Sequence, residues 1–221
     1  MTARSRVPLD GPVAHVGPVL ATVLLLLRGS INRLNRLMVP ALNIGLGPWL
    51  ATPMGGYLLV LRTRGHRTGL RRDAPLSYRI ADGSIWILAG FGPATHWYRN
   101  LLADPEVEVR LPGRDLRCRA SEVRDPAVRR RIAPDLVRAT GIPGLLIGCN
   151  PWTAGEDRIL AQLEGVPLIR LDPETGPLAP GPDDPGGRAW IWRQGLVAGI
   201  VFGLARLFRR AGRVNNAPQV G

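Results

Sequence analysis

Lysine is absent from this chain, and its absence excludes several kinds of chemistry. All 29 basic residues are arginines. No lysine Schiff base can form, which excludes pyridoxal-dependent enzymes and lysine aldolases. A Walker-type phosphate loop is excluded as well, because that loop needs its lysine to hold the phosphates.

Cysteine and histidine are scarce. The two cysteines, Cys118 and Cys149, form no Cys-x-x-Cys pair, and we expect them to be buried small hydrophobic residues in a reducing compartment. The three histidines, His15, His66 and His96, lie far apart in the sequence and make no pair at helical spacing. No metal site is therefore expected.

Acidic residues are too few to balance the arginines. The chain has 17 of them, which gives a net charge of +12 over 221 residues. A charge this positive implies an anionic partner, whether nucleic acid, anionic lipid or a polyanionic ligand. The length suits one domain with extensions, and the 45% of hydrophobic residues can form a sizeable core.

Composition divides the chain into four regions. Residues 1–50 are apolar and arginine-rich and are expected to form a helical extension. Residues 51–171 carry the pattern of a folded domain. Residues 172–188, with five prolines and four glycines, are typical of a linker. Residues 189–221 combine an apolar helical segment with a polar tail.

The folded domain is predicted to be mainly β with helices, an α+β arrangement. Turn signals at Asp82-Gly83 and Pro112-Gly113 mark two hairpins. Several short antiparallel strands with few helices between them indicate a small barrel. The expected strands are 57–63, 75–80, 84–90, 107–111, 115–123 and 166–171, and the expected helices are 95–102, 125–138 and 156–163.

The densest feature is a basic turn at residues 62–72. Five arginines and one histidine occur there without an acidic residue. Gly65 and Gly69 allow backbone N–H groups to approach an anion, and arginine side chains match phosphate and carboxylate oxygens. Because an uncompensated arginine cluster repels itself, we interpret it as an anion cradle rather than a solvated turn.

A second feature follows the third expected strand. Glycines in the run 89–92 would let a flat ring lie against the backbone, and Trp97, Tyr98 and Asn100 follow within ten residues. An aromatic pair on a short helix is more often part of a core, so this feature is informative mainly in combination with the basic turn.

The order of these motifs resembles the deazaflavin (F420)-dependent nitroreductase and quinone reductase family. The resemblance covers about residues 54–171. It rests on the Gly-x-x-Thr-Gly turn, the arginine after it, a Pro-Leu strand, an Asp-Gly hairpin, and the Ala-Gly-x-Gly, Trp-Tyr-x-Asn-Leu and Asp-Pro-x-Val-x-Val motifs. It implies an actinobacterial enzyme with a split β-barrel of the FMN-binding type that binds coenzyme F420.

Carried over position by position, the resemblance implies a set of cofactor-binding residues. The turn would hold the phosphate, the Pro-Leu pair would line the deazaflavin ring, and the later motifs would form the rest of the pocket. This set is Gly65, His66, Arg67, Thr68, Gly69, Arg72, Pro75, Leu76, Ala89, Gly90, Phe91, Gly92, Trp97, Tyr98 and Asn100.

Two departures from the family pattern bear on the substrate. Phe91 stands where many members have lysine, and residues 141–155 contain Trp152 as their one aromatic residue instead of a tyrosine-rich lid. Nitroimidazole reduction is therefore not expected.

The implied reaction is transfer of a hydride between F420 and an electron-poor organic acceptor such as a quinone, an enone or a nitro compound. Ser77 and Tyr78 follow the Pro-Leu pair and could orient the acceptor or deliver a proton. Side-chain alternation lets one of the two face the pocket; the family match favours Ser77, which leaves Tyr78 in the core.

Two segments near the ends suggest a membrane surface. Residues 28–39 predict a helix with apolar side chains in one arc and arginines opposite. Residues 189–208 approach the length of a bilayer span but contain Arg193 and Arg206. We expect a cytoplasmic enzyme at the inner face of the membrane, acting on a small lipophilic substrate. Packing of these segments on the protein itself, or a homodimer contact, is the alternative.

Two other functions compete with this interpretation. A split barrel that binds FMN or haem would explain the basic turn equally well, because the turn fits any phosphate. A non-catalytic protein that binds nucleic acid or anionic lipid would explain the charge but not the glycine and aromatic motifs, so nucleic acid is not the expected partner.

Overall fold

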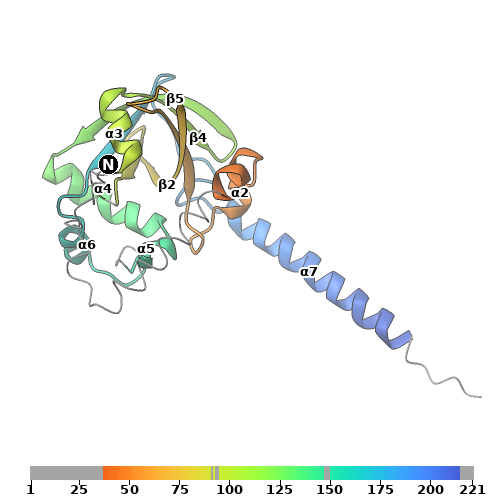
Figure 1. Ribbon diagram of the computed structural model, residues 1–221. Helices are drawn as coiled ribbons and strands as arrows, with labels where there is room; N and C mark the ends of the chain where they lie inside the picture. The colour runs from red at the N-terminus through yellow and green to blue at the C-terminus, as the bar shows by residue number, and fades with distance from the viewer. Residues whose placement is uncertain (1–36, 91, 93–94, 147–149, 215–221) are drawn as a thin grey trace, which may run out of the picture.

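A closed six-stranded antiparallel barrel forms the centre of the molecule, in the order β1-β2-β3-β6-β5-β4 (Figure 1). The computed structural model describes residues 37–90, 92, 95–146 and 150–214. The predicted mainly-β barrel with helices is confirmed. The strands are β1 (Leu58–Arg64), β2 (Arg71–Ala81), β3 (Ser84–Leu88), β4 (Glu106–Leu111), β5 (Arg114–Val123) and β6 (Leu168–Pro173).

Tight turns join the strands where the sequence predicts them. Asp82 and Gly83 both have positive φ angles, of 53° and 77°, as a two-residue hairpin between β2 and β3 requires. The register places Tyr78 opposite Ile87 and Ala81 opposite Ser84. Residues Leu58 to Leu61 form a continuous apolar run in β1, and Leu59, Val60 and Leu61 are fully buried. This strand is therefore covered on both faces.

Short helices cover the barrel. The predicted helices are present as α3 (His96–Ala103), α4 (Pro126–Ala139) and α6 (Glu156–Gln162). The side chain of Asp125 caps α4 by accepting a hydrogen bond from the backbone N–H of Ala127. The other described helices are α2 (Gly47–Leu50), α5 (Pro143–Leu146) and α7 (Ala189–Val214).

The N-terminal extension is described only from residue 37 onward. The predicted amphipathic helix 28–39 lies mostly outside the described residues, as does the apolar run 13–27. Residues 37–43 are helical and lead into α2. Asn43 reaches the barrel, where its side-chain oxygen accepts hydrogen bonds from Arg62 and Arg110 at 3.0 Å each.

The proline- and glycine-rich stretch before α7 packs against the barrel. Its Leu178 lies against the core, and the Leu178 N–H donates to the carbonyl of Gly83 at 2.8 Å. Asp184 is 2% exposed, and Arg79 donates to the carbonyl of Pro185 at 2.8 Å. The stretch predicted as a linker is thus a strap fixed along the barrel.

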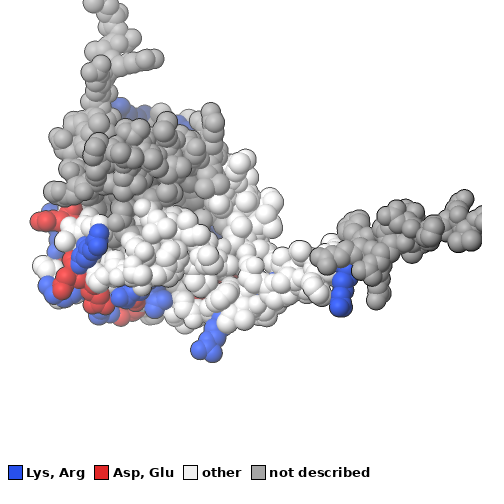
Figure 2. All heavy atoms as spheres, turned by 90° about the horizontal axis from the view of Figure 1, so that it is seen from below, with Lys and Arg blue, Asp and Glu red and all other residues white. Residues whose placement is uncertain are grey.

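Helix α7 leaves the barrel and extends away from it as an arm (Figure 1). Figure 2 shows most of its described surface as uncharged, with isolated arginines and no acidic side chain. Among the described residues, no helix has the length and hydropathy needed to cross a membrane.

Candidate functional site

The basic turn between β1 and β2 is closed by its own backbone. The Gly65 N–H donates to the carbonyl of Leu70 at 2.8 Å, and the Gly69 N–H donates to the carbonyl of Gly65 at 2.7 Å. Gly69 has a φ of 65°, and a Cβ on Gly65 would lie 2.9 Å from the hydroxyl of Thr68. Both glycines are therefore needed for the tight path of the turn.

Asn100 of α3 holds this turn in place. Its side-chain oxygen accepts hydrogen bonds from the backbone N–H of His66 at 3.1 Å and lies 2.8 Å from His66 Nδ1. Its amide donates to the hydroxyl of Thr63 at 3.0 Å. Asn100 and Thr63 are both buried. The two motifs that sequence reasoning singled out are thus joined, with Asn100 as the positioning residue.

The aromatic residues of α3 close the barrel next to this contact. Trp97 and Tyr98 are buried in the main core with their rings edge to face, 6.3 Å between centroids. The Tyr98 hydroxyl donates to Glu122 at 2.9 Å. Burial and this hydrogen bond raise the pKa of Tyr98. Both side chains therefore support the end of the barrel.

The arginines around the turn differ in their partners. Arg62 lies 3.6 Å from Asp73 and 3.8 Å from Glu108, and Arg71 lies 3.5 Å from Asp73. The side chains of Arg64, Arg67 and Arg72 have no hydrogen bond or ion pair with any described residue. They are exposed, and a Cβ on Gly65 would lie 3.8 Å from the Arg72 side chain, so Arg72 folds along the turn. These unpaired charges fit an anionic ligand.

Strand β2 separates the predicted ring-lining and catalytic residues onto two faces. Leu76 packs against the barrel core, and Tyr78 is fully buried in it. Alternation then places Pro75 and Ser77, both partly exposed, on the outer face. Pro75 and Ser77 can share a pocket on that face, whereas Leu76 and Tyr78 line the interior.

The hydroxyl of Tyr78 belongs to a buried polar network. It donates to Asp184 of the strap at 2.6 Å, and the same carboxylate accepts hydrogen bonds from Arg114 and from the backbone N–H of Gly181 at 2.5 Å. Burial, together with the negative charge of Asp184, raises the pKa of Tyr78. A tyrosine held this way ties the strap to the barrel and does not reach the outer face.

The glycine run after β3 begins beside the same part of β2. Because Tyr78 pairs with Ile87, the residues after Ile87 run alongside those before Tyr78. Ala89 is fully buried, Gly92 donates to its carbonyl at 2.7 Å, and a Cβ on Gly90 would meet open space. Phe91 lies outside the described residues. Thr95 immediately precedes α3, and its hydroxyl donates to the carbonyl of Gly92 at 2.7 Å.

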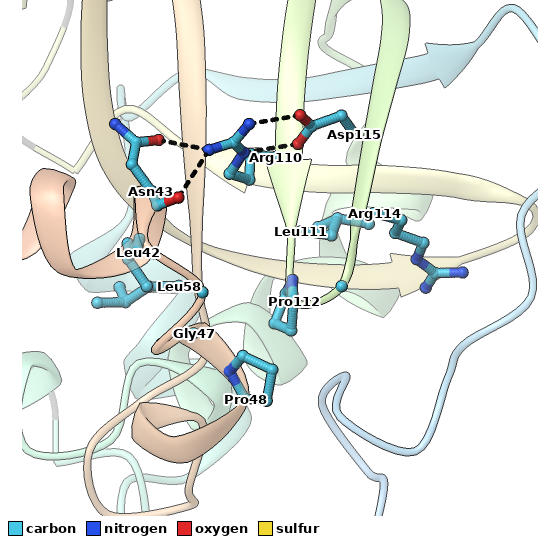
Figure 3. Close-up of a pocket in the computed structure, with 12 residues that line it drawn as sticks. Leu42, Asn43, Gly47, Pro48, Leu58, Arg110, Leu111, Pro112, Arg114 and Asp115 are labelled. Atoms are coloured by element: carbon cyan, nitrogen blue, oxygen red, sulfur yellow. Dashed lines mark hydrogen bonds and ion pairs between the residues drawn. The ribbon is translucent and has the colours of Figure 1, made fainter.

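A cavity of about 330 Å³ lies between residues 42–48, Leu58 of β1 and the β4–β5 hairpin (Figure 3). Leu58 lines it and is paired directly with Ser77 in the β1–β2 register. Opposite residues on antiparallel strands have Cβ atoms about 5 Å apart, so Ser77 lies beside Leu58 without itself lining the cavity. We call it the β1–β4 cavity; its lining includes Leu42, Asn43, Gly47, Pro48, Leu58, Arg110, Leu111, Pro112, Arg114 and Asp115.

Charge in the β1–β4 cavity is fixed by an internal ion pair. Arg110 donates to both carboxylate oxygens of Asp115, at 2.7 and 2.6 Å, and to Asn43 (Figure 3). The hydrogen bond from Arg110 lowers the pKa of Asp115. These polar groups therefore have partners, and leucine, proline and glycine residues together with Arg114 form the rest of the wall.

Sequence reasoning missed the cavity residues. The available signal was the apolar run at Leu58–Leu61, which predicts a covering layer on the outer face of β1 but not which segment supplies it. In the described residues no group of three or more histidine, cysteine, aspartate or glutamate side chains could hold a metal ion. Cys118 is buried, and burial raises its pKa to about 12.

Comparisons with known proteins give one family match. Residues 34–140 match the family model of the F420H(2)-dependent quinone reductases. The search of curated protein sequences found no significant match.

Solved structures with a similar fold include proteins of different function. A conserved hypothetical protein from Mycobacterium tuberculosis is 20% identical; the match covers 53% of this chain and 72% of that protein, with a TM-score of 0.42. The heme storage protein HutZ from Vibrio cholerae is 18% identical; the match covers 53% of this chain and 81% of HutZ, with a TM-score of 0.39. An F420-H2 dependent reductase is 17% identical; the match covers 52% of this chain and 93% of the reductase, with a TM-score of 0.35. Similarities of this size do not identify a function.

Proposed function

We propose that this chain, whose residues 34–140 match the family model of the F420H(2)-dependent quinone reductases, reduces a lipophilic quinone with a hydride from F420. The family match supports an F420-dependent oxidoreductase. The acceptor and the roles of individual residues are our proposals. The observation that carries them is the position of the unpaired arginine turn, Pro75, Ser77 and the β1–β4 cavity along one side of the barrel.

The basic turn is the proposed site for the acidic part of F420. Arg67 and Arg72 are exposed and without acidic partners, and the turn itself is held by Asn100. Two guanidinium groups at a glycine-rich turn suit phosphate and carboxylate oxygens. The deazaflavin ring would then lie along Pro75 toward Ala89 and Gly90, within reach of Ser77.

The β1–β4 cavity is the proposed acceptor site. Its volume is near the lower end of the range for small-molecule pockets, and its wall is mostly apolar. F420, when bound, supplies the hydride; the protein's part is to place the acceptor beside the ring and exclude water. Ser77, across from Leu58, is positioned to hydrogen-bond an acceptor carbonyl.

A lipophilic acceptor fits an enzyme located in the cytoplasm at the inner face of the membrane, since long-chain quinones dissolve in lipid. This location is part of the proposal. It requires a surface of the protein that binds lipid, and it predicts recovery of the enzyme in the membrane fraction of cells at physiological salt.

The reaction is tested with reduced F420 that carries deuterium at the transferring carbon. With an enone acceptor, we expect the label in the product and a primary isotope effect where hydride transfer limits turnover. Single-turnover oxidation with a water-soluble quinone measures the rate under the same conditions. Loss of the label to solvent in every product, or tighter binding of FMN than of F420, would contradict the proposal.

A further inference from the structure

Helix α7 exposes a large apolar surface far from the barrel. Its first turns are fixed: Ala189 is buried, and Arg193 pairs with Asp183 and donates to the carbonyl of Pro48 at 3.0 Å. From Ile191 onward, large apolar side chains are 40% to 62% exposed along the arm. They are Ile191, Trp192, Leu196, Val197, Ile200, Val201, Phe202 and Leu204. An isolated apolar helix of this kind needs an apolar environment.

The exposed side chains are distributed around the helix. At about 100° per residue, those of Leu196, Val197, Ile200, Val201 and Leu204 fall within an arc of about 140° and form an aliphatic side. Ile191, Trp192 and Phe202 lie on the other side. A single partner helix would cover one of these sides and leave the other in water, whereas at a membrane interface the aliphatic side can enter the acyl chains while the other side lies among the headgroups.

The charges on α7 have one sign. Residues 189–214 contain no aspartate or glutamate, and arginines stand at positions 193, 206, 209, 210 and 213. Asp183 neutralises Arg193 at the base, while Arg206 lies over the Phe202 ring at 5.0 Å and has no acidic partner among the described residues. The positive charge is thus concentrated toward the far end of the arm, which complements an anionic surface.

The body of the protein continues this apolar surface at the base of the arm. Leu46, Trp49 and Leu50, in and next to α2, are exposed, and so is Ile44. Arg193 lies 6.0 Å from the Trp49 ring and 5.0 Å from the Trp192 ring, which joins α2 to α7 (Figure 1). Tryptophans at the edge of an apolar surface are typical of the boundary between lipid and water.

We infer that α7, with α2 at its base, binds the surface of an anionic lipid bilayer. Its uncharged segment 195–205 is about 16 Å long, about half the hydrocarbon thickness of a bilayer, so the helix lies in the interface and does not cross it. The aliphatic side enters the acyl chains, and the arginines reach the headgroups. This inference rests on the proposed membrane location and deepens it, because it names the helix and the lipid charge.

This placement has a consequence for the acceptor. Gly47 and Pro48 of α2 line the β1–β4 cavity, and Pro48 also contacts Arg193 of α7. The cavity therefore adjoins the lipid-binding surface. A lipophilic acceptor can enter it from the membrane without crossing bulk water.

The test is flotation of the full-length protein with lipid vesicles. Vesicles of phosphatidylglycerol and phosphatidylcholine should carry the protein at least tenfold better than phosphatidylcholine alone, and 0.5 M salt should weaken binding. The variant Leu196→Gln, Ile200→Gln, Leu204→Gln should lose at least tenfold in binding. The matched control Leu102→Gln, Ile142→Gln, Leu145→Gln changes three exposed aliphatic residues of the body and should bind as the unchanged protein does.

Three results would overturn the inference. The first is equal flotation of the α7 variant and the unchanged protein, and the second is equal binding to neutral and anionic vesicles. The third is that the unchanged protein forms a dimer, whereas the α7 variant is a monomer that binds lipid as well as before. In that case α7 would be a contact between two copies of the chain. Turnover of reduced F420 with a water-soluble quinone is measured in parallel. If turnover is absent while vesicle binding follows the expected pattern, the proposed reaction fails and the lipid inference stands.

Discussion

At the scale of single residues, side chains that look equivalent in the sequence differ in their ion pairs, hydrogen bonds and burial. Arg62 and Arg71 are neutralised by Asp73, one residue beyond the basic segment, while Arg67 and Arg72 are not. The same holds for Ser77 and Tyr78, which are adjacent in the chain but lie on opposite faces of β2. Function is expected from the members that have no structural partner.

Replacing Arg67 and Arg72 with alanine should weaken F420 binding. Each arginine would lose charge-assisted hydrogen bonds of about 1.5–3 kcal/mol, so the affinity should fall by at least about tenfold. The turn is exposed, so the thermal stability should change little. The control is Arg130→Ala with Arg158→Ala, which removes the same charge from exposed arginines elsewhere. Fluorescence titration with F420 gives the affinities. An equal loss of affinity in both variants would show that the net charge of the protein, and not a site at the turn, determines F420 binding.

Ser77→Ala and Tyr78→Phe should affect different properties. Ser77→Ala should lower the rate of hydride transfer by about tenfold to a few hundredfold, through lost orientation or proton delivery, and leave stability unchanged. Tyr78→Phe should lower the free energy of unfolding by about 1.5–3 kcal/mol, because buried Asp184 loses a hydrogen bond.

Tyr57→Phe is the control for the stability effect. Tyr57 is buried, but its hydroxyl has no hydrogen bond to a described residue, so the change should cost less. Denaturant unfolding and single-turnover kinetics measure the two effects. A catalytic loss in Tyr78→Phe with unchanged stability would reverse the roles assigned to Ser77 and Tyr78.

At the scale of elements, the site depends on the contact between the β1–β2 hairpin and α3. Asn100 makes this contact to His66 and Thr63, residues 34 and 37 positions away. The barrel brings these elements together because α3 closes the end of the barrel with Trp97, Tyr98 and Leu101. The shape of the anion cradle therefore depends on packing as well as on its glycines.

Asn100→Ala should loosen the turn without removing any arginine. The buried Thr63 hydroxyl loses its partner, at a cost of about 1–3 kcal/mol in unfolding free energy, and F420 affinity should fall because the turn is no longer fixed. Asn150→Ala is the control: Asn150 accepts hydrogen bonds from the N–H groups of Trp152 and Thr153 in a separate turn. Its change should affect stability but not F420 binding, and a similar drop in F420 affinity in both variants would mean that general destabilisation is the cause.

At the scale of the whole molecule, the positive charge has two uses. Within the barrel many arginines are ion-paired, as Arg110 is with Asp115 and Arg114 is with Asp184. Among the described residues, exposed arginines without an ion pair include Arg64, Arg67 and Arg72 of the hairpin turn, and the sequence places further arginines toward the far end of α7. We therefore propose that one molecule combines a compact cradle for a small anion with an extended apolar arm for an anionic surface, and we expect mutations to separate the two.

The sequence by itself determined the strands, their turns and the chemistry of the basic segment. Local patterns suffice there, since Asp82-Gly83 and the Gly65–Gly69 spacing act within a few residues. The structure extends β2 back to Arg71, because pairing with β1 continues to Arg64. Element boundaries of this kind depend on the partner strand and not on local preference.

Only the tertiary structure decided which residues meet. No local pattern links Tyr78 to Asp184, 106 positions later, or places Leu42 and Pro48 over Leu58 to form a cavity. The strap from 172 to 188 looks like a linker because prolines and glycines dominate it, yet buried Asp184 holds it to the barrel. These outcomes depend on contacts between distant segments. Such contacts contribute to stability only once the chain has closed into the barrel and the entropy cost of loop closure has been met.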